Sequence, residues 1–190
     1  MRGWRGQILK IDLTARTTSI EPLPDDLCRR YVGGRGLAGH FLAPRVTRKC
    51  DEPEMPLILM AGPLVGTALP MSGFCSMMSR SPLTGTVGDC ALGGTVGTMI
   101  KRVGFDGVII SGCSEAPCGI AIRDNDVRFV DAADLWGRDS EFVHAHLEGA
   151  GAAVTIGPAA ENGVRFANVI VDRRDAAGRN GLGLVMAAKR

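Results

Sequence analysis

The sequence predicts an α+β fold in a single domain that spans residues 1–190. Segments typical of strands and of helices follow one another in mixed order, without the regular alternation of a doubly wound sheet. The length of 190 residues and the hydrophobic content of 45% suit one core. No shift in composition marks a linker, so no domain boundary is predicted within the chain.

The N-terminal segment is predicted to form a hairpin followed by a broken helix. Residues 6–23 alternate apolar with polar positions, and β-branched residues follow a turn near Ala15 and Arg16. Helical spacing of apolar residues begins next, with Asp25 as the expected cap. The glycines expected to interrupt this helix, before it resumes over residues 37–42, are Gly33, Gly34 and Gly36.

The middle of the chain is predicted to hold a buried strand, small-residue loops and a short helix. The apolar run at 56–62 has turn residues at both ends, which favours a buried strand. Residues 63–94 are interpreted as loops, because a Pro-Leu-x-Gly-Thr phrase occurs twice among small residues. A helix is expected over residues 94–104, and its apolar face comprises Met99, Ile100 and Val103.

The C-terminal half is predicted to alternate strands with helical segments. Strands are expected at 106–112 and within 118–132, with the turn of the second segment at Asp124-Asn125. Residues 131–150 form the expected helical region, capped by Asp131 or Asp134. Its expected core-facing residues are Phe142, Val143 and Leu147. Further strands are expected within 152–159 and 164–172, and a glycine-rich loop then leads into a last helix.

Charge and hydropathy argue against several classes of protein. The net charge of +2 is close to neutral and the basic residues are scattered, which does not favour nucleic-acid or membrane-surface binding. No apolar stretch approaches the roughly 20 residues of a membrane span, and no signal-peptide pattern is visible. These observations predict a cytoplasmic protein without a membrane span.

Cysteine and histidine patterns do not predict a metal site within this chain. The six cysteines include no Cys-x-x-Cys pair, and we expect free thiols. His144 and His146 are two residues apart on an expected helix and do not share a face. The Gly-x-Gly-x-x-Gly match at 34–39 follows a helical segment rather than a strand, and the nearest acidic residues, Asp51 and Glu52, come early for a ribose contact, which disfavours dinucleotide binding.

Small residues predict a flat surface that accepts a ligand against backbone. Glycine accounts for 26 of the 190 residues and clusters in motifs between apolar segments. The loops at 63–94 and 173–183 are predicted to converge into a platform for an extended polyanionic ligand. Charge-assisted bonds would come from the arginines of the second loop, which are Arg173, Arg174 and Arg179.

Several phrases in this order resemble the N-terminal domain of the aldehyde ferredoxin oxidoreductases. They are "GPLVGT", "RSPLTGTVG", "LGGTVGTMIKRVGFDGVIISG", "DAADLWG", "IGPAAENGVRFANVIVD" and "DAAGRNGLGLVMAAKR". The resemblance runs from "GWRGQILKIDLT" to the last residue. It implies an α+β domain with two mixed β-sheets and short helices, on which a tungsten or molybdenum bis-pterin rests. It also implies oxidation of aldehydes to carboxylic acids, with electrons passing through a 4Fe–4S cluster to ferredoxin.

Motif matching implies which residues of this chain contact the cofactor. One set, from the glycine-pair loop and the segment before it, comprises Phe74, Ala91 and Gly93. The other set, from the "DAAGR" loop, comprises Asp175, Ala176, Gly178 and Arg179. Backbone carbonyls of Ala91 and Ala176 would bind the magnesium ion that bridges the two pterins. No catalytic residue is expected in this chain.

The chain departs from the family pattern in ways that leave its function open. Family members have arginines where this chain has Phe74 and Asp175, and a carboxylate near a phosphate is repulsive. The helical domains that carry the cluster and the substrate pocket are expected outside this sequence, on a second chain or elsewhere. One hypothesis is a cofactor-binding domain or subunit of an oxidoreductase, incomplete on its own. The alternatives are a non-catalytic paralogue that acts in assembly or interaction, and a protein for another small ligand; a homo-oligomer is compatible with the first two hypotheses.

Overall fold

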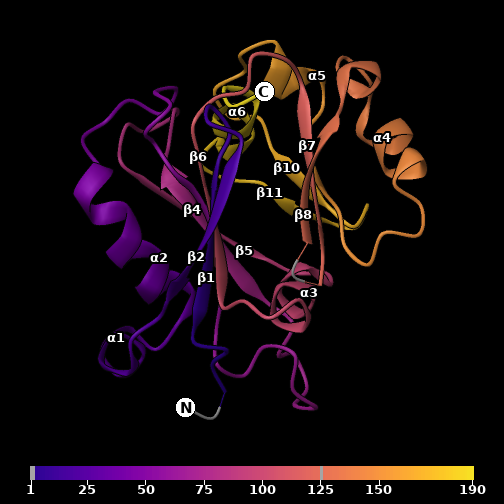
Figure 1. Ribbon diagram of the computed structural model, residues 1–190. Helices are drawn as coiled ribbons and strands as arrows, with labels where there is room; N and C mark the ends of the chain where they lie inside the picture. The colour runs from indigo at the N-terminus through magenta and orange to yellow at the C-terminus, as the bar shows by residue number, and fades with distance from the viewer. Residues whose placement is uncertain (1–2, 125) are drawn as a thin grey trace.

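A six-stranded sheet forms the centre of the molecule (Figure 1). The computed structural model describes residues 3–124 and 126–190. The sheet has the order β2-β1-β6-β3-β4-β5, with β1 parallel to β6 and every other neighbouring pair antiparallel. Its strands are β1 (Gln7–Asp12), β2 (Thr17–Pro22), β3 (Leu57–Ala61), β4 (Cys75–Arg80), β5 (Val87–Leu92) and β6 (Gly107–Ser111).

Two smaller antiparallel sheets complete the β-structure of the described residues. One has the order β11-β10-β9, and its strands are β9 (Val154–Thr155), β10 (Val169–Val171) and β11 (Asp175–Ala177). The other is a hairpin of β7 (Cys118–Arg123) and β8 (Asp126–Asp131). The α+β class with short helices is confirmed. The described residues form three sheets rather than two, and only the largest is mixed.

The helices are short, and they lie against the central sheet, against the sheet of β9, β10 and β11, or against one another. The α-helices are α1 (Asp25–Tyr31), α2 (Gly34–Leu42), α3 (Val96–Arg102), α4 (Ser140–His146), α5 (Pro158–Glu161) and α6 (Leu182–Ala187). Two 3-10 turns cover Ala43–Arg45 and Ala133–Leu135. None of the described helices is long and apolar enough to cross a membrane.

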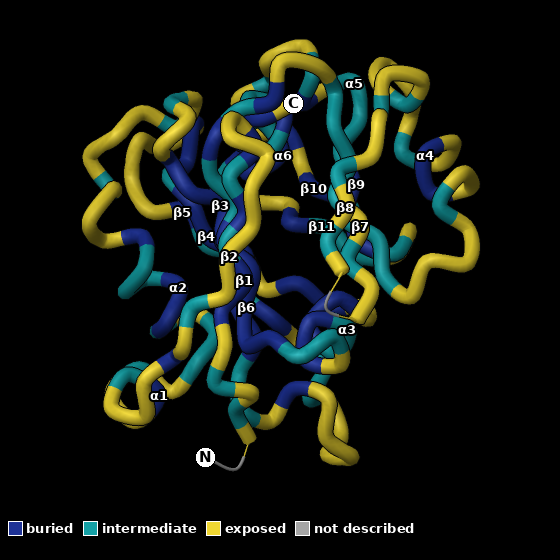
Figure 2. The backbone as a smooth tube through the Cα atoms, viewed as in Figure 1, coloured by how far each residue is buried: buried dark blue, intermediate teal, exposed yellow. Residues whose placement is uncertain are grey.

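Strand alternation places a hydrophobic core on each face of the sheet. Ile8 and Ile58 face α1 and α2, whereas their neighbours Leu9 and Leu59 face α3, β10 and α6. Figure 1 shows α1 and α2 on one side of the sheet and α3, β10 and β11 on the other. Figure 2 shows the central strands largely buried and β2 largely exposed, while intermediate and exposed residues mix along the hairpin β7–β8. The sheet is therefore a middle layer, and β5 forms one of its edges.

The predicted hairpin, the buried strand β3 and helix α3 are confirmed, but the interpretation of 63–94 as loops is wrong over two strands. β4 and β5 lie within that range and pair with each other. The second Pro-Leu-x-Gly-Thr phrase forms the turn of this hairpin, where Ser81 N–H donates to the Thr86 carbonyl over 2.8 Å. Serine, glycine and aspartate in β4 and β5 hide the strand pattern, because these residues disfavour isolated strands.

Two predictions about where helices begin and end are wrong: one at the glycines 33–36, the other in the region 131–150. Gly34 and Gly36 lie inside α2 rather than between helices, and a Cβ at Gly36 would overlap the Tyr31 carbonyl. Pro24, not Asp25, occupies the cap position of α1. The cap of α4 is Asp139, whose Oδ1 accepts a hydrogen bond from Phe142 N–H at 2.8 Å. The predicted caps Asp131 and Asp134 lie before this helix.

The core face of α4 is also shifted from the prediction. Phe142 is exposed, and the buried residues of the helix are Val143 and His144. The prediction missed His144 because it counted only apolar residues as facing the core. The predicted turn at Asp124-Asn125 falls partly outside the described residues, because Asn125 is not among them.

A buried ion pair fastens the N-terminal segment to the turn after α3. Lys101 and Asp106 are 5% and 0% exposed, and Lys101 Nζ lies 2.5 Å from Asp106 Oδ1. The Asp106 carboxylate also accepts hydrogen bonds from the backbone N–H groups of Arg5 (3.0 Å) and Gly6 (2.7 Å). Lys101 Nζ donates in turn to the Gly3 carbonyl at 2.8 Å. The carboxylate is satisfied on both oxygens, which stabilises the entry into β1.

Candidate functional site

The predicted site residues gather where the end of β5 meets β11. Ala91 lies on β5 and Gly93 directly follows it, while Asp175 and Ala176 lie on β11. β11 packs against β5, so two segments more than 80 residues apart become neighbours. The remaining predicted residues are Phe74, immediately before β4, and Gly178 and Arg179, in the loop before α6. We call this set of seven residues the platform.

Gly93 is covered by side chains of the platform itself. A Cβ atom at Gly93 would overlap the Asp175 carboxylate and would lie 3.4 Å from the Phe74 ring. Asp175 Oδ1 accepts a hydrogen bond from Ala176 N–H at 2.8 Å, which fixes the carboxylate in this position. Phe74 is 47% exposed, so its ring covers Gly93 on the solvent side. The absence of a side chain at Gly93 makes room for Asp175.

A second aspartate occupies the space above Gly94. Asp172 Oδ2 would lie 2.5 Å from a Cβ at Gly94, whose φ of +70° also favours glycine. The same oxygen accepts hydrogen bonds from Thr95 N–H at 2.6 Å and Thr95 Oγ1 at 2.7 Å, and Oδ1 accepts one from Ala153 N–H at 2.8 Å. The glycine pair thus admits two carboxylates, Asp172 from the turn between β10 and β11 and Asp175 from the first position of β11.

Hydrogen bonds to Asp172 determine its charge state. Burial alone would raise the pKa of Asp172, but the bonds from Thr95 and Ala153 outweigh it and hold the pKa below its usual range. The carboxylate therefore stays ionised near neutral pH. Because its oxygens are occupied by these donors, Asp172 links β10, α3 and the segment before β9.

The loop from Gly178 to Gly181 is attached to the outer edge of β5. Asn180 Nδ2 donates to the Asp89 carbonyl at 3.0 Å, and Cys90 Sγ donates to the Arg179 carbonyl at 3.2 Å. Ser81 Oγ, fully buried, donates to the Asn180 carbonyl at 2.7 Å. Sequence reasoning missed Ser81, Cys90 and Asn180 as positioning residues; only the Asn-Gly dipeptide at 180–181 signals a turn.

Gly181 is where this loop passes closest to other backbone. A Cβ at Gly181 would overlap the Arg165 carbonyl, and the residue has a φ of +71°. Arg165 Nε donates to the Pro82 carbonyl at 3.1 Å, so the contact joins the loop to the turn of the β4–β5 hairpin. Only glycine satisfies both the conformation and the space at this position.

The exposed part of the platform carries small residues and positive charge. Ala91, Gly178 and Arg179 are exposed, and no ion pair among the described residues involves Arg179. Arg173 Nε lies 3.6 Å from Glu141 Oε1, with the two side chains 40% and 77% exposed. An anionic ligand would therefore find a cation at Arg179, whereas Phe74 and Asp175 offer none.

Histidines and cysteines do not assemble a metal centre in the described residues. No group of three or more His, Cys, Asp or Glu side chains in this part of the chain is arranged to hold a metal ion. All six cysteines are free thiols. Burial raises the pKa of Cys75 to about 12, which keeps this thiol protonated and unreactive beside the platform.

His144 connects α4 to β9 through a buried hydrogen bond, which makes stability depend on pH. Its Nε2 lies 3.0 Å from Thr155 Oγ1. Burial, and then Arg173, lowers the pKa of His144 below 6.5, against smaller opposing effects of Asp172 and Glu141. As pH falls below 6.5 the unfolded chain binds this proton first, so we expect the free energy of unfolding to decrease.

Urea unfolding at pH 7.5, 6.5 and 5.5 measures this effect against a His144→Gln variant. Glutamine keeps a hydrogen-bonding side chain and does not titrate, so the loss on acidification should be smaller in the variant. Equal losses in both proteins would show that His144 binds its proton equally well in the folded and unfolded states.

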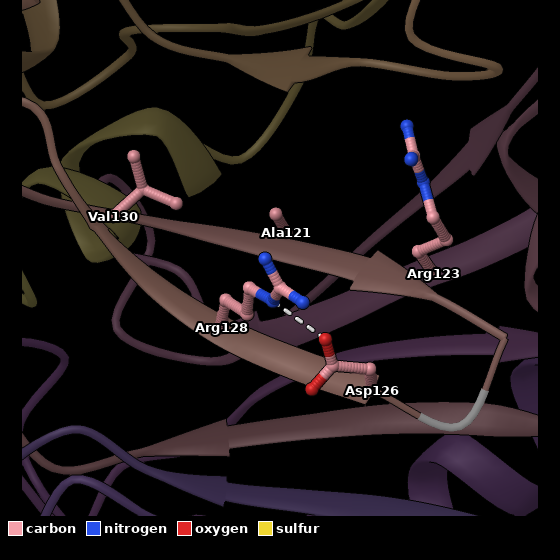
Figure 3. Close-up of a pocket in the computed structure, with 5 residues that line it drawn as sticks. All are labelled: Ala121, Arg123, Asp126, Arg128 and Val130. Atoms are coloured by element: carbon pink, nitrogen blue, oxygen red, sulfur yellow. Dashed lines mark hydrogen bonds and ion pairs between the residues drawn. The ribbon is translucent and has the colours of Figure 1, made fainter.

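The molecule also has a hollow away from the platform, shown in Figure 3. It has a volume of about 350 Å³ and is lined by one exposed face of the hairpin, with Ala121, Arg123, Asp126, Arg128 and Val130. Arg128 Nε pairs with Asp126 Oδ2 at 2.5 Å, and both side chains are more than half exposed. It includes none of the predicted site residues, and its polar groups do not converge on an enclosed space.

Comparison with known proteins identifies the relatives of this chain. Residues 8–190 match the family model described as aldehyde ferredoxin oxidoreductase, N-terminal domain. The tungsten-containing aldehyde ferredoxin oxidoreductases of Pyrococcus abyssi and Pyrococcus furiosus are 38% and 34% identical over the whole chain. The alignments cover 32% of each relative, so the chain spans about a third of the length of these proteins.

Two further proteins that match this chain have names that describe other activities. A protein of Pyrococcus furiosus named aliphatic sulfonate oxidoreductase, WOR-like subunit, is 30% identical over the whole chain, which covers 34% of it. A solved structure of the active site complex BamBC of benzoyl coenzyme A reductase, with 1,5-dienoyl-CoA, superposes with a TM-score of 0.92. That match has 28% identity and covers 99% of this chain and 30% of the solved one.

Proposed function

The chain belongs to the aldehyde ferredoxin oxidoreductase family, and we propose that it supplies the platform on which the pterin cofactor of a tungsten oxidoreductase rests. The observation that carries the proposal is the meeting of the two predicted contact segments at the end of β5 and at β11. The names of the curated relatives support tungsten over molybdenum. The proposed overall reaction is oxidation of an aldehyde to a carboxylic acid, with ferredoxin as the electron acceptor.

The residues of the platform fit one part of a pterin and not another. Ala91 and Gly178 expose backbone without bulky side chains, which suits close approach of a flat ring system. A pterin phosphate would need a cation, and Phe74 and Asp175 supply none. Arg179 remains as the exposed cation of the platform. We keep the backbone carbonyls of Ala91 and Ala176 as the proposed magnesium ligands, since magnesium prefers oxygen.

Further parts of the proposed enzyme lie outside these 190 residues. The chain covers about a third of its curated relatives. We assign the remaining cofactor contacts, the 4Fe–4S cluster and the substrate pocket to polypeptide beyond this sequence, on the same chain or on a second one. The role of the described residues is to bind and orient the cofactor. Six free thiols support a cytoplasmic location, where thiols stay reduced.

Anaerobic purification from the native cells tests the proposal. We expect tungsten and pterin to co-purify with the chain, measured by elemental analysis and by fluorescence of the oxidised pterin. Replacing Arg179 with glutamine should lower the pterin content severalfold, because the cation facing the cofactor is lost. The same change at Arg128, on the hairpin β7–β8, serves as the control and should leave the content unchanged. A protein free of tungsten, molybdenum and pterin would overturn the proposal.

A non-catalytic role in assembly is the second candidate, and two observations favour it. Gly93, one of the predicted contacts, is covered by Asp175 and Phe74. The segment before β4 also exposes a group of apolar side chains, which comprises Leu64, Leu69, Met71 and Phe74. Under this candidate the purified complex contains a partner polypeptide bound to this chain but neither tungsten nor pterin.

A further inference from the structure

We infer that Asp175 and Phe74 close the Gly93 end of the platform to anionic groups, so that Asp175 is a specificity-determining residue of this site. The inference rests on the proposed function, because it concerns how the platform selects its ligand. It assigns uncharged or cationic parts of a ligand to Gly93 and anionic parts to Arg179. The inference follows from the negative charge of Asp175 and from the contacts that Asp175 and Phe74 make at Gly93.

Asp175 is held over Gly93 by local geometry. Its Oδ1 accepts the hydrogen bond from Ala176 N–H at 2.8 Å, and the other side of the carboxylate lies where a Cβ of Gly93 would be. None of the ion pairs among the described residues involves Asp175, so its negative charge is not neutralised by a neighbouring cation. A phosphate at Gly93 would meet this carboxylate at contact distance.

Phe74 completes the closure on the solvent side. A Cβ at Gly93 would lie 3.4 Å from its ring, and 47% of the side chain remains exposed. An aromatic ring offers no donor to a phosphate oxygen, and removing water from an anion without replacing its hydrogen bonds is unfavourable. An apolar ring and an unpaired carboxylate together therefore disfavour an anion by two independent effects.

The other end of the platform has the opposite character. Arg179 is exposed, and its backbone carbonyl is fixed to β5 by Cys90 Sγ at 3.2 Å. Asn180 Nδ2 fixes the next residue through the Asp89 carbonyl at 3.0 Å. The loop that carries the Arg179 cation is thus held in place by hydrogen bonds, while the Asp175 carboxylate on β11 contacts Gly93. This division of charge orients a ligand that is anionic at one end.

Titration of the isotope-labelled 190-residue chain with pyrophosphate, followed by the amide resonances of Gly93, Gly178 and Arg179, tests the inference. We expect the Gly93 resonance of the natural chain to stay in place. Asp175→Asn keeps the hydrogen bond to Ala176 N–H and removes the charge, so pyrophosphate should bind at Gly93 at least about tenfold more tightly. Phe74→Ala should give a smaller gain, because it removes the cover and leaves the carboxylate.

The control variant is Asp26→Asn, which removes the same charge from the exposed first turn of α1 and should not affect Gly93. The gain from Asp175→Asn should also shrink when sodium chloride is raised from about 50 mM to 500 mM, as expected for a charge effect. A Gly93 resonance that moves equally in the natural chain and in Asp175→Asn, or in neither, overturns the inference.

The resonances of Gly178 and Arg179 test the proposed function, and the resonance of Gly93 tests the inference about Asp175. Failure of one can therefore be distinguished from failure of the other. Movement of the Gly178 and Arg179 resonances in the natural chain supports anion binding by the platform, as the proposed function requires. If these resonances stay still, the proposed function loses its anion site. The comparison of Asp175→Asn with the natural chain at Gly93 still decides the inference in that case.

Discussion

Replacing Asp106 with alanine is expected to lower the free energy of unfolding by about 3–5 kcal/mol. The change leaves the Lys101 ammonium, 5% exposed, without its counter-charge, and leaves the N–H groups of Arg5 and Gly6 without an acceptor. Urea denaturation followed by circular dichroism measures the loss. A double variant, Asp106→Ala with Lys101→Met, removes both charges. Its loss in free energy of unfolding should be smaller than the sum of the losses from the two single changes.

An exposed ion pair of similar length provides the matched control. Lys10 Nζ lies 2.6 Å from Glu21 Oε1, but the two side chains are 38% and 47% exposed. Glu21→Ala should therefore cost no more than about 1 kcal/mol, because water already screens the pair. If Asp106→Ala cost as little as Glu21→Ala, burial would not be what gives the Lys101–Asp106 pair its importance.

Replacing Gly181 with alanine is expected to destabilise the chain by about 3 kcal/mol and to displace the loop that carries Arg179. A left-handed backbone conformation costs a non-glycine residue about 1 kcal/mol or more, and the added methyl group overlaps the Arg165 carbonyl. The Arg165 carbonyl belongs to the backbone and cannot rotate away as a side chain would. Chemical denaturation measures the stability, and the amide resonances of Gly178 and Arg179 report the displacement.

Gly163 separates the two causes of this effect. It has a similar φ of +78°, but a Cβ there would meet nothing within 4 Å. Gly163→Ala should therefore cost only about 1 kcal/mol, from the conformation alone. Equal losses at positions 163 and 181 would mean that the contact with Arg165 contributes nothing and that backbone strain explains both.

Local patterns in the sequence predict those elements whose side chains alternate or repeat regularly. The β1–β2 hairpin and β3 are examples, because their apolar residues alone define which face is buried. β4 and β5 escaped prediction because they contain serine, glycine and aspartate, and their strand conformation depends on pairing with β3 and with each other. The two sheets were implied by the resemblance, whereas the described residues form three, because the hairpin β7–β8 is a sheet of its own.

The sequence indicated which segments would meet at the candidate site but not the geometry of their contact. Small-residue motifs correctly indicated that the segments around residues 93 and 175 meet. They did not indicate that the Asp175 carboxylate would cover Gly93, because this depends on side-chain rotation at the junction of two sheets. Ser81 and Asn180 were missed because single polar residues in turns give no pattern, although their hydrogen bonds fix the Arg179 loop. The ligand assigned to these residues stays a prediction.

The parallel pairing of β1 with β6 sets the earliest time at which both edges of β1 can be paired during synthesis. Ile8 pairs with Gly107 and Asp12 with Ser111, so about a hundred residues separate the partners. A ribosome that adds 5–20 residues per second makes β1 wait roughly 5–20 s for its neighbour. Throughout that interval β1 can pair only with β2, so the backbone groups of its other edge have no strand partner. One edge of β1 therefore stays open to other strands until β6 emerges, and Leu9 stays uncovered until β10 and α6 follow.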